Sequence, residues 1–210
     1  MIKILNAYAG IGGNRKLWNT LTEKLEITAI EIDRSIAKIY HNFFQQDHVY
    51  IKDAHNYIKE NYNKYDFIWS SPPCLTHSRL NNFSYNKKID YPNFKLYEEI
   101  IFLNKYFKGK FIVENVIPYY RFLIQPSLII GRHAYWSNFN LNKYFFVKNN
   151  KIMKDASVSY FLKLYGFDNF KHKNKRQLLR NCVEPEVGLF LLLSSLEKDH
   201  QNAQLSFNYD

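Results

Sequence analysis

Short apolar runs alternate with segments of helical spacing over the first half of the chain. The runs at residues 2–8, 27–32, 49–51, 66–69 and 111–114 predict five strands. Between them, apolar positions three and four apart predict helices at residues 14–24, 34–43, 54–62 and 94–106. Strands that alternate with helices favour a parallel sheet with helices on both faces. The pattern therefore predicts an α/β sandwich of Rossmann type.

The second half of the chain has a different pattern. Residues 127–146 predict two or three strands in hairpin arrangement, and residues 148–175 are polar, basic and poor in core positions. Residues 185–196 predict a helix with a strongly apolar face, and the polar tail that follows is expected to fray. We find no internal repeat.

Composition limits the class of protein. A chain of 210 residues with 46% hydrophobic and 18% aromatic residues can bury the core of one domain. No apolar run approaches the ~18 residues of a membrane span, and the first residues lead directly into a strand, so we expect neither membrane insertion nor a signal peptide. Two cysteines, Cys74 and Cys182, form neither a disulfide framework nor a four-ligand zinc site. We expect no metal, and a reducing compartment such as the cytoplasm.

The charge is strongly positive. The chain has 29 basic and 19 acidic side chains, a formal net charge of +10. Such a charge favours binding to nucleic acid, because lysine and arginine release counterions from a polyanion. A composition rich in Lys, Asn, Ile and Tyr explains the same charge without any partner.

Chemistry is expected where strands end, because ligands of open α/β sheets bind beyond the carboxyl ends of the strands. The first strand ends in a glycine cluster, residues 9–13, which serves either a cofactor or a plain turn. Glu31, after the second strand, is placed to accept hydrogen bonds from a ribose, while Asp33 is placed to cap a helix. Asp53, after the third strand, can accept from an exocyclic amine or cap the next helix.

The fourth and fifth strands give the most specific signal. Residues 70–74 read SSPPC, in which two prolines fix the backbone and present Cys74 at the ligand edge. A cysteine thiolate is a strong nucleophile. Glu114 ends the neighbouring strand between apolar residues, and burial there would raise its pKa and let it donate a proton.

These motifs together resemble those of the DNA (cytosine-5)-methyltransferase family. The resemblance covers roughly residues 1–140 and 175–197, in the family's unpermuted order. It rests on the glycine motif at 6–13, Glu31-Ile32-Asp33, Asp53, Pro73-Cys74, Glu114-Asn115-Val116 and Asn181-Cys182-Val183.

The resemblance implies methyl transfer from S-adenosylmethionine to carbon 5 of a cytosine flipped out of double-stranded DNA. Cys74 would add to carbon 6, Glu114 would hold ring nitrogen 3, and Arg132 is the best match to an arginine that contacts the cytosine carbonyl. The implied cofactor residues are Tyr8, Ala9, Gly10, Gly12, Gly13, Glu31, Ile32, Asp53, Pro73, Asn181 and Val183. Tyr8 and Asp53 would lie near the adenine, and Glu31 on the ribose. Ser78 and a loop with Arg79, Lys87 and Lys88 would close over the base and the phosphates.

Several positions depart from the family. Asn6 replaces Asp, Leu75 replaces the Gln that follows the nucleophile, and Arg180 replaces a Gly before Asn181. The arginine motif is reduced to Arg132 and its neighbours, for which a phosphate contact is an alternative.

The largest departure is a short target-recognition region. We expect residues 1–140 to form the catalytic and cofactor domain, 141–174 the reduced recognition region, 175–197 a return to the catalytic domain, and 198–210 a flexible tail. The recognition region interleaves aromatics with basic residues, among them Lys171 and Lys173, followed directly by Lys175. Lysines on phosphates position a protein but read little sequence, so we expect a short target. Alternatively, about half of the aromatics form a small satellite core.

Other functions remain open at this stage. A nucleotide-dependent oxidoreductase would explain the glycine turn and Glu31 but not Cys74 beside Glu114, and an amino-group methyltransferase would have an aromatic residue at position 74. A catalytically silent DNA-binding or partner subunit, and an RNA cytosine methyltransferase, are compatible with the same motifs. A restriction-modification partner, viral self-protection in an infected host and a regulatory role would leave the same residues.

Overall fold

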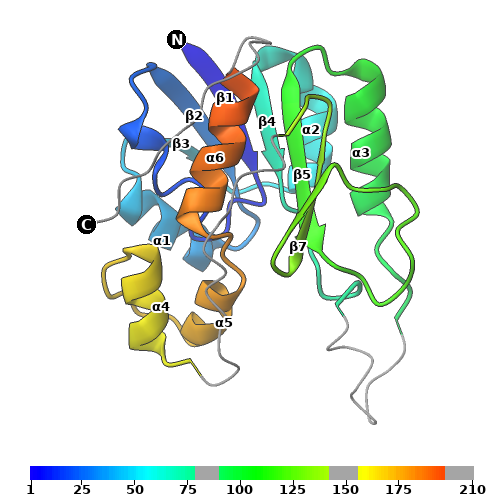
Figure 1. Ribbon diagram of the computed structural model, residues 1–210. Coiled ribbons are helices and arrows are strands. Elements are labelled where there is room, and N and C mark those ends of the chain that lie inside the picture. Colours follow the sequence, from blue (N-terminus) through cyan, green and yellow to red (C-terminus); the bar gives the residue numbers. More distant parts are fainter. Residues whose placement is uncertain (79–89, 142–155, 197–210) are drawn as a thin grey trace.

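The computed structural model describes residues 1–78, 90–141 and 156–196 (Figure 1). The strands are β1 (Ile2–Ala7), β2 (Leu25–Ile30), β3 (His48–Tyr50), β4 (Phe67–Ser70), β5 (Lys110–Val116), β6 (Leu128–Ile130) and β7 (His133–Ser137). The helices are α1 (Arg34–Phe43), α2 (Ala54–Asn61), α3 (Lys95–Tyr106), α4 (Val158–Tyr165), α5 (Lys175–Arg180) and α6 (Pro185–Leu196). Two short 3-10 turns are η1 (Trp18–Thr20) and η2 (Tyr62–Lys64).

The seven strands form one mostly parallel sheet in the order β3-β2-β1-β4-β5-β7-β6. Strands β1 to β5 run parallel to one another, and β7 is antiparallel to both β5 and β6. This arrangement confirms the predicted Rossmann-like α/β fold. The strand order reverses between β1 and β4, which is where ligands of such sheets bind.

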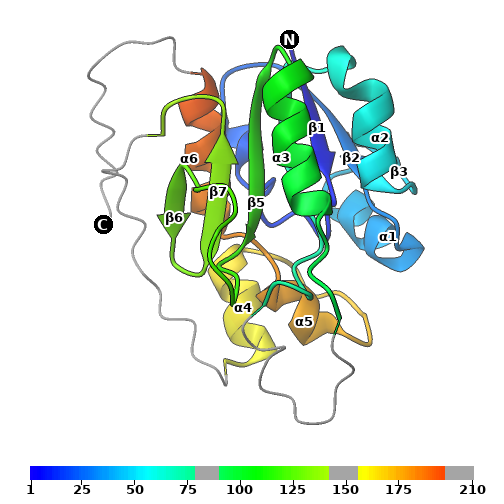
Figure 2. The ribbon, with the colours of Figure 1, turned by 90° about the vertical axis from the view of Figure 1, so that its right-hand side faces the viewer.

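Alternation along the strands builds a core on each face of the sheet. Ile4 of β1 belongs to a cluster with residues of η1 and α6, whereas Leu5 belongs to a cluster with α2 and α3. Figure 2 shows α3 and α2 on one side of the sheet and α6 on the other. Both side chains are fully buried, so β1 is a central strand covered on both faces.

The helix predicted at residues 14–24 is wrong, because the structure has only turns and η1 there. Asn14 and Arg15 instead turn their side chains into buried hydrogen bonds, to Asn6 and to Asp47. The backbone of Asn14 also lies against Gly188 of α6, where an added Cβ would come 2.1 Å from the Asn14 carbonyl oxygen. The weak helix formers between positions 19 and 22 give no local preference to oppose these contacts.

The expectation that residues 148–175 are poor in core positions is also wrong for the described part. Phe161, Tyr165 and Phe167 are at most 5% exposed and pack in one cluster with Tyr40 and Phe44 of the α1 region. The described aromatics here therefore form the satellite core that was the alternative. Helices α4 and α5 lie beyond the carboxyl ends of the strands (Figure 1). The domain boundaries proposed from sequence stay predictions.

No helix among residues 1–78, 90–141 and 156–196 is long and apolar enough to span a membrane.

Candidate active site

The loop after β1 lies at the strand-order reversal and has an unusual backbone. Tyr8, Gly10 and Gly12 have φ angles of 56°, 55° and 83°, in the left-handed region that glycine adopts freely. At Gly12 an added Cβ would come 2.3 Å from the ring of Phe44, so this glycine packs against α1. At Gly10 an added Cβ would meet no atom within 4 Å, so the loop faces open space there.

Glu31 holds this loop from the end of β2. Its Oε2 accepts a hydrogen bond from the Gly10 amide at 3.0 Å, and its Oε1 accepts from the Asp33 amide at 2.9 Å. Burial raises the pKa of Glu31, and these amide bonds work against that rise. The neighbouring Ile32 side chain is 67% exposed, an uncommon state for an isoleucine at a sheet edge.

Both aspartates of the cofactor region cap helices. Asp33 accepts from the amides of Ser35 and Ile36 at the start of α1, and Asp53 accepts from the Asn56 amide at the start of α2. These bonds confirm the capping role of both residues. Asp53 also lies 3.7 Å from the Lys95 ammonium, in a partly exposed pair. Its contact with an adenine amine stays a prediction.

The loop after β4, which carries Cys74, is bound to the neighbouring strand β5. The Asn115 side chain donates to the Pro72 carbonyl at 2.9 Å, and its own oxygen accepts from the Val116 amide at 2.9 Å. Behind Cys74 the chain turns, since the amides of His77 and Ser78 both donate to the Cys74 carbonyl. The buried His77 ring fixes this turn, with Nδ1 2.6 Å from the Tyr120 hydroxyl and Nε2 3.0 Å from the Asn93 carbonyl.

The thiol of Cys74 is partly buried and lies in the field of two charged groups. Burial raises the pKa of Cys74, the Glu114 carboxylate raises it further, and the Arg132 guanidinium lowers it. The free site therefore holds Cys74 as a thiol at neutral pH.

Glu114 is a buried acid that keeps its proton to a higher pH than a free carboxyl group does. Burial raises the pKa of Glu114 to about 7, opposed by the Ser71 hydroxyl and by Arg132. His133 Nε2 lies 3.8 Å from Glu114, but burial lowers the pKa of His133 to about 3. The two side chains are therefore not an ion pair, because the imidazole is neutral at physiological pH.

Arg132 connects the catalytic strands to the C-terminal segment. It follows Gly131, whose φ is 57°, in the turn between β6 and β7, and its guanidinium donates to the Arg180 carbonyl. The Arg132 Nε is buried without a hydrogen-bond partner in the described parts of the chain. Burial raises the pKa values of Cys182 and Glu184, and the Arg132 guanidinium opposes both rises. Its charge therefore acts on the C-terminal segment as well as on Cys74 and Glu114.

The C-terminal motif lies against the glycine loop. An added Cβ at Gly13 would come 2.6 Å from the Cys182 Cβ and 2.7 Å from the Val183 carbonyl oxygen. Arg180 ends α5 and Asn181 has helical backbone angles, so the arginine in place of the family's glycine continues the helix. Cys182 is buried, and burial raises its pKa to about 12.

Sequence reasoning missed two buried polar networks. Asn6, the replacement for Asp, accepts from Asn14 at 2.9 Å and lies 3.5 Å from the Tyr40 hydroxyl. That hydroxyl donates to Asp47, which pairs with Arg15 at 2.9 Å.

The second network surrounds Glu99 of α3. Its spacing with Leu96, Ile100 and Leu103 on one helix face was the signal that could have found it.

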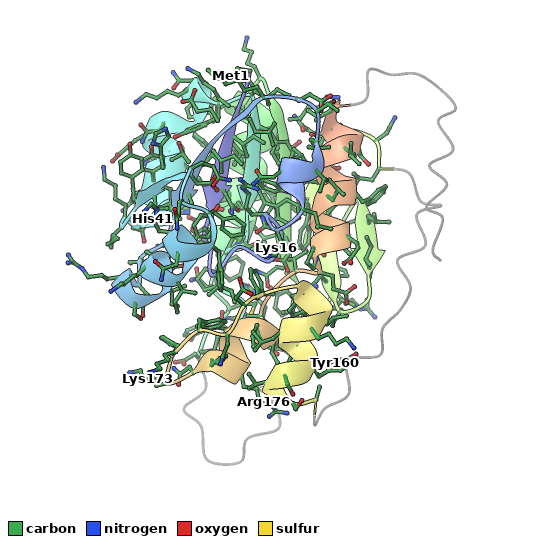
Figure 3. The ribbon with its side chains drawn as sticks, turned by 90° about the vertical axis from the view of Figure 1, so that its left-hand side faces the viewer. Met1, Lys16, His41, Tyr160, Lys173 and Arg176 are labelled. Atoms are coloured by element: carbon green, nitrogen blue, oxygen red, sulfur yellow. The ribbon has the colours of Figure 1, made fainter. Side chains whose placement is uncertain are left out.

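The predicted nucleic-acid residues are only partly described. Ser78 lies next to Pro118 in an isolated antiparallel bridge, and Arg79, Lys87 and Lys88 lie outside the described residues. Lys171 and Lys173 are exposed, whereas Lys175 is held by Asn169 and lies 4.9 Å from the Phe170 ring centroid. Figure 3 shows Lys173, Arg176 and Tyr160 at the end of the molecule opposite Met1.

The sequence profile of the C-5 cytosine-specific DNA methylase family matches residues 2–118, more than half of the chain. The chain belongs to this family. The match confirms the predicted family over those residues, and the cofactor of that family is S-adenosylmethionine. A comparison with curated proteins gave no match.

Solved structures give weaker similarities to the methylase. A DNMT2 variant from Spodoptera frugiperda is 27% identical with a TM-score of 0.40, over 55% of this chain and 36% of that chain. The methyltransferase EhMeth of Entamoeba histolytica is 19% identical with a TM-score of 0.38, over 55% of this chain and 38% of that one. The methylase thus spans little more than a third of the length of these two proteins.

Proposed function

We propose that this methylase transfers a methyl group from S-adenosylmethionine to carbon 5 of cytosine in DNA, through a transient covalent bond to Cys74. One observation carries the proposal: Cys74 and Glu114 lie close enough for the carboxylate to raise the pKa of the thiol, and the charge of Arg132 acts on both. A nucleophile, a proton donor and a cation thus converge beside the glycine loop.

The two acids divide the proton chemistry. Glu114, with a pKa of about 7, is partly protonated at neutral pH and can give its proton to cytosine nitrogen 3. The Cys74 thiol loses its proton to water, and the thiolate bonds to carbon 6 while the electrons of the carbon 5–carbon 6 double bond shift toward the protonated nitrogen 3. Carbon 5 becomes the nucleophile for the methyl group that the cofactor supplies when bound. Loss of the carbon 5 proton to a base then breaks the bond to sulfur, and nitrogen 3 returns its proton to Glu114.

Substrate binding itself would activate the thiol. The Glu114 carboxylate is one reason why the pKa of Cys74 is high. When the Glu114 side chain binds the cytosine in its protonated form, that repulsion disappears while Arg132 remains. The thiolate is therefore formed next to its target rather than in the free protein.

The residues present fit S-adenosylmethionine. The open side of Gly10 leaves room for a ligand against the loop, and Glu31 is anchored at the end of β2, where its carboxylate would accept hydrogen bonds from the ribose hydroxyls. The exposed face of Ile32 suits the adenine ring, and the packing of Val183 against Gly13 closes the other side.

The net charge of +10 favours a nucleic acid substrate, and we infer that it is duplex DNA from which the target cytosine is flipped out. A good bidentate contact to a base contributes ~1–3 kcal/mol of discrimination, and so short a recognition region supplies only a few of them. We therefore propose a target of about two to four base pairs.

Trapping with a fluorinated substrate tests the proposal. Duplex DNA with 5-fluorocytosine has no carbon 5 proton to lose, so the wild type should stop as a protein–DNA adduct that survives denaturing electrophoresis. Cys74→Ser should give no adduct, and Cys182→Ser is the matched control that should trap normally. An adduct with Cys74→Ser would disprove the nucleophile. Trapping by RNA but not by DNA would transfer the proposal to an RNA substrate.

A further inference from the structure

A buried carboxylate outside the catalytic set binds three elements of the cofactor side. Glu99 of α3 is 2% exposed. Its Oε1 accepts from the Tyr8 hydroxyl at 2.6 Å and lies 2.9 Å from His55 Nδ1, and its Oε2 accepts from the Ser70 hydroxyl at 2.5 Å. Helix α3 also packs on the sheet through its apolar residues Leu96, Ile100 and Leu103.

The three partners all stand at strand ends of the site. Tyr8 opens the glycine loop with a left-handed φ of 56°, a conformation that is strained for a tyrosine. Ser70 is the last residue of β4, immediately before the loop that carries Cys74. His55 follows Asp53 by two residues at the start of α2. One carboxylate therefore joins the loop after β1, the end of β4 and the start of α2.

A carboxylate suits this arrangement better than an amide does. It offers acceptor positions on both oxygens, whereas a glutamine offers one acceptor oxygen and an NH2 group that cannot accept. The Tyr8 hydroxyl remains a donor, because burial and the Glu99 charge raise its pKa. The Glu99 bond also raises the pKa of His55, whose Nε2 lies 3.3 Å from Glu98, and the Lys95 charge opposes this rise. The Asp53 charge adds to the rise in the pKa of Tyr8.

We propose that Glu99 is a positioning residue for the cofactor, which acts by fixing the strained Tyr8 against the adenine side of the site. The inference rests on the proposed function, since it places S-adenosylmethionine over the glycine loop. It goes beyond that function by assigning the orientation of Tyr8 to a carboxylate from a distant helix. Tyr8 and Glu99 then form one unit, and losing either partner has the same effect.

A double-mutant cycle in cofactor binding tests this unit. The affinity of S-adenosylhomocysteine, the product form of the cofactor, is measured by calorimetry for the wild type, Tyr8→Phe, Glu99→Gln and the double variant. We expect each single variant to bind about tenfold more weakly, the effect of one charge-assisted hydrogen bond. The double variant should bind no more weakly than Glu99→Gln alone, rather than a further tenfold more weakly, because Tyr8→Phe acts only through the contact with Glu99.

The control is Glu60→Gln, the same change of charge at an exposed position of α2, which should bind like the wild type. Thermal unfolding identifies any variant that fails to fold, and Tyr8→Phe removes only one oxygen, so it keeps the test decisive. Additive losses, or unchanged affinity in Tyr8→Phe, would overturn the role of Glu99. Absence of binding by the wild type would instead overturn the cofactor site of the proposed function.

Discussion

The side-chain amide of Asn115 donates to the carbonyl of Pro72 at 2.9 Å and so ties the loop that carries Cys74 to the strand that carries Glu114. Because Asn115 directly follows Glu114, this bond sets the separation between Glu114 and Cys74. The register of β4 and β5, in which Ser70 lies opposite Val113, brings the two loops to the same edge. The strand register and the Asn115 bond therefore hold the backbone on either side of the thiol and the carboxyl group.

Replacing Asn115 should therefore reduce the rate more than the affinity. Asn115→Ala leaves the Pro72 carbonyl without its donor and frees Cys74 to move. A misplacement of about 1 Å costs on the order of 10²-fold in rate. We expect a loss of that size in single-turnover methylation with little change in cofactor affinity by calorimetry. Equal losses in rate and in cofactor affinity would mean that Asn115 supports the whole site instead.

The reactivity of Cys74 should respond to its two charged neighbours in opposite directions. Since Glu114 raises the pKa of the thiol, Glu114→Gln should shift the pH profile of iodoacetamide alkylation to lower pH. The same variant should nevertheless lose on the order of 10²-fold in methylation rate. Arg132→Gln should shift it to higher pH. In the wild type, alkylation of Cys74 should still be rising at pH 9.

Mass spectrometry of the alkylated peptides measures both cysteines at once. Buried Cys182 is the internal control and should stay unmodified in the folded protein, because burial raises its pKa to about 12. A Cys74 profile that is the same in the Glu114 and Arg132 variants would show that these charges do not reach the thiol.

Glu31 and Asp33 should separate affinity from stability. Glu31→Ala removes the carboxylate proposed for the ribose together with the acceptor of the Gly10 amide, so calorimetry should show clearly weaker binding of S-adenosylhomocysteine without DNA. Asp33→Ala removes only a helix cap and should cost about 0.5–2 kcal/mol of unfolding free energy. Its cofactor affinity should remain that of the wild type. If only Asp33→Ala bound the cofactor more weakly, the ribose would bind to Asp33 and its assignment to Glu31 would be wrong.

The catalytic half of the fold was accessible from sequence because its signals are local. The periodicity at residues 34–43 and 185–196 gave α1 and α6 with their observed bounds. Glycines, prolines and acids at strand ends predicted where the site lies, since carboxyl ends of parallel strands meet at one edge. In Asp33 and Asp53 the capping role of the residue type was also the observed one.

What sequence could not give depends on contacts between distant residues. The failed helix at 14–24 reflects Asn14 and Arg15, whose partners lie up to 174 positions away at Gly188. The raised pKa of Cys74 follows from burial and from Glu114, which is 40 residues later. The core positions of α4 were not recognised because the segment is rich in lysine. Phe161 and Tyr165 are buried by packing against Tyr40 and Phe44 of the α1 region, a contact between distant parts of the chain.

The exposed lysines after α4 should contribute charge rather than sequence readout. Lys171 and Lys173 flank His172, which lies 3.3 Å from the Ser35 hydroxyl and holds this segment to α1. Lys175 is already engaged with Asn169, so we expect it to contribute less than the other two.

Replacing Lys171 and Lys173 with alanine should therefore weaken binding to all DNA sequences alike. Each lost phosphate contact lowers the slope of log affinity against log salt by about 0.9, so the slope should fall by up to about 2. Binding is measured by fluorescence anisotropy between 50 and 300 mM salt, about the range where this effect is large. The control replaces Lys24 and Lys108, which precede β2 and β5 at the opposite edge of the sheet, and should keep the wild-type slope. A loss confined to one target sequence, at an unchanged slope, would show that these lysines read bases instead.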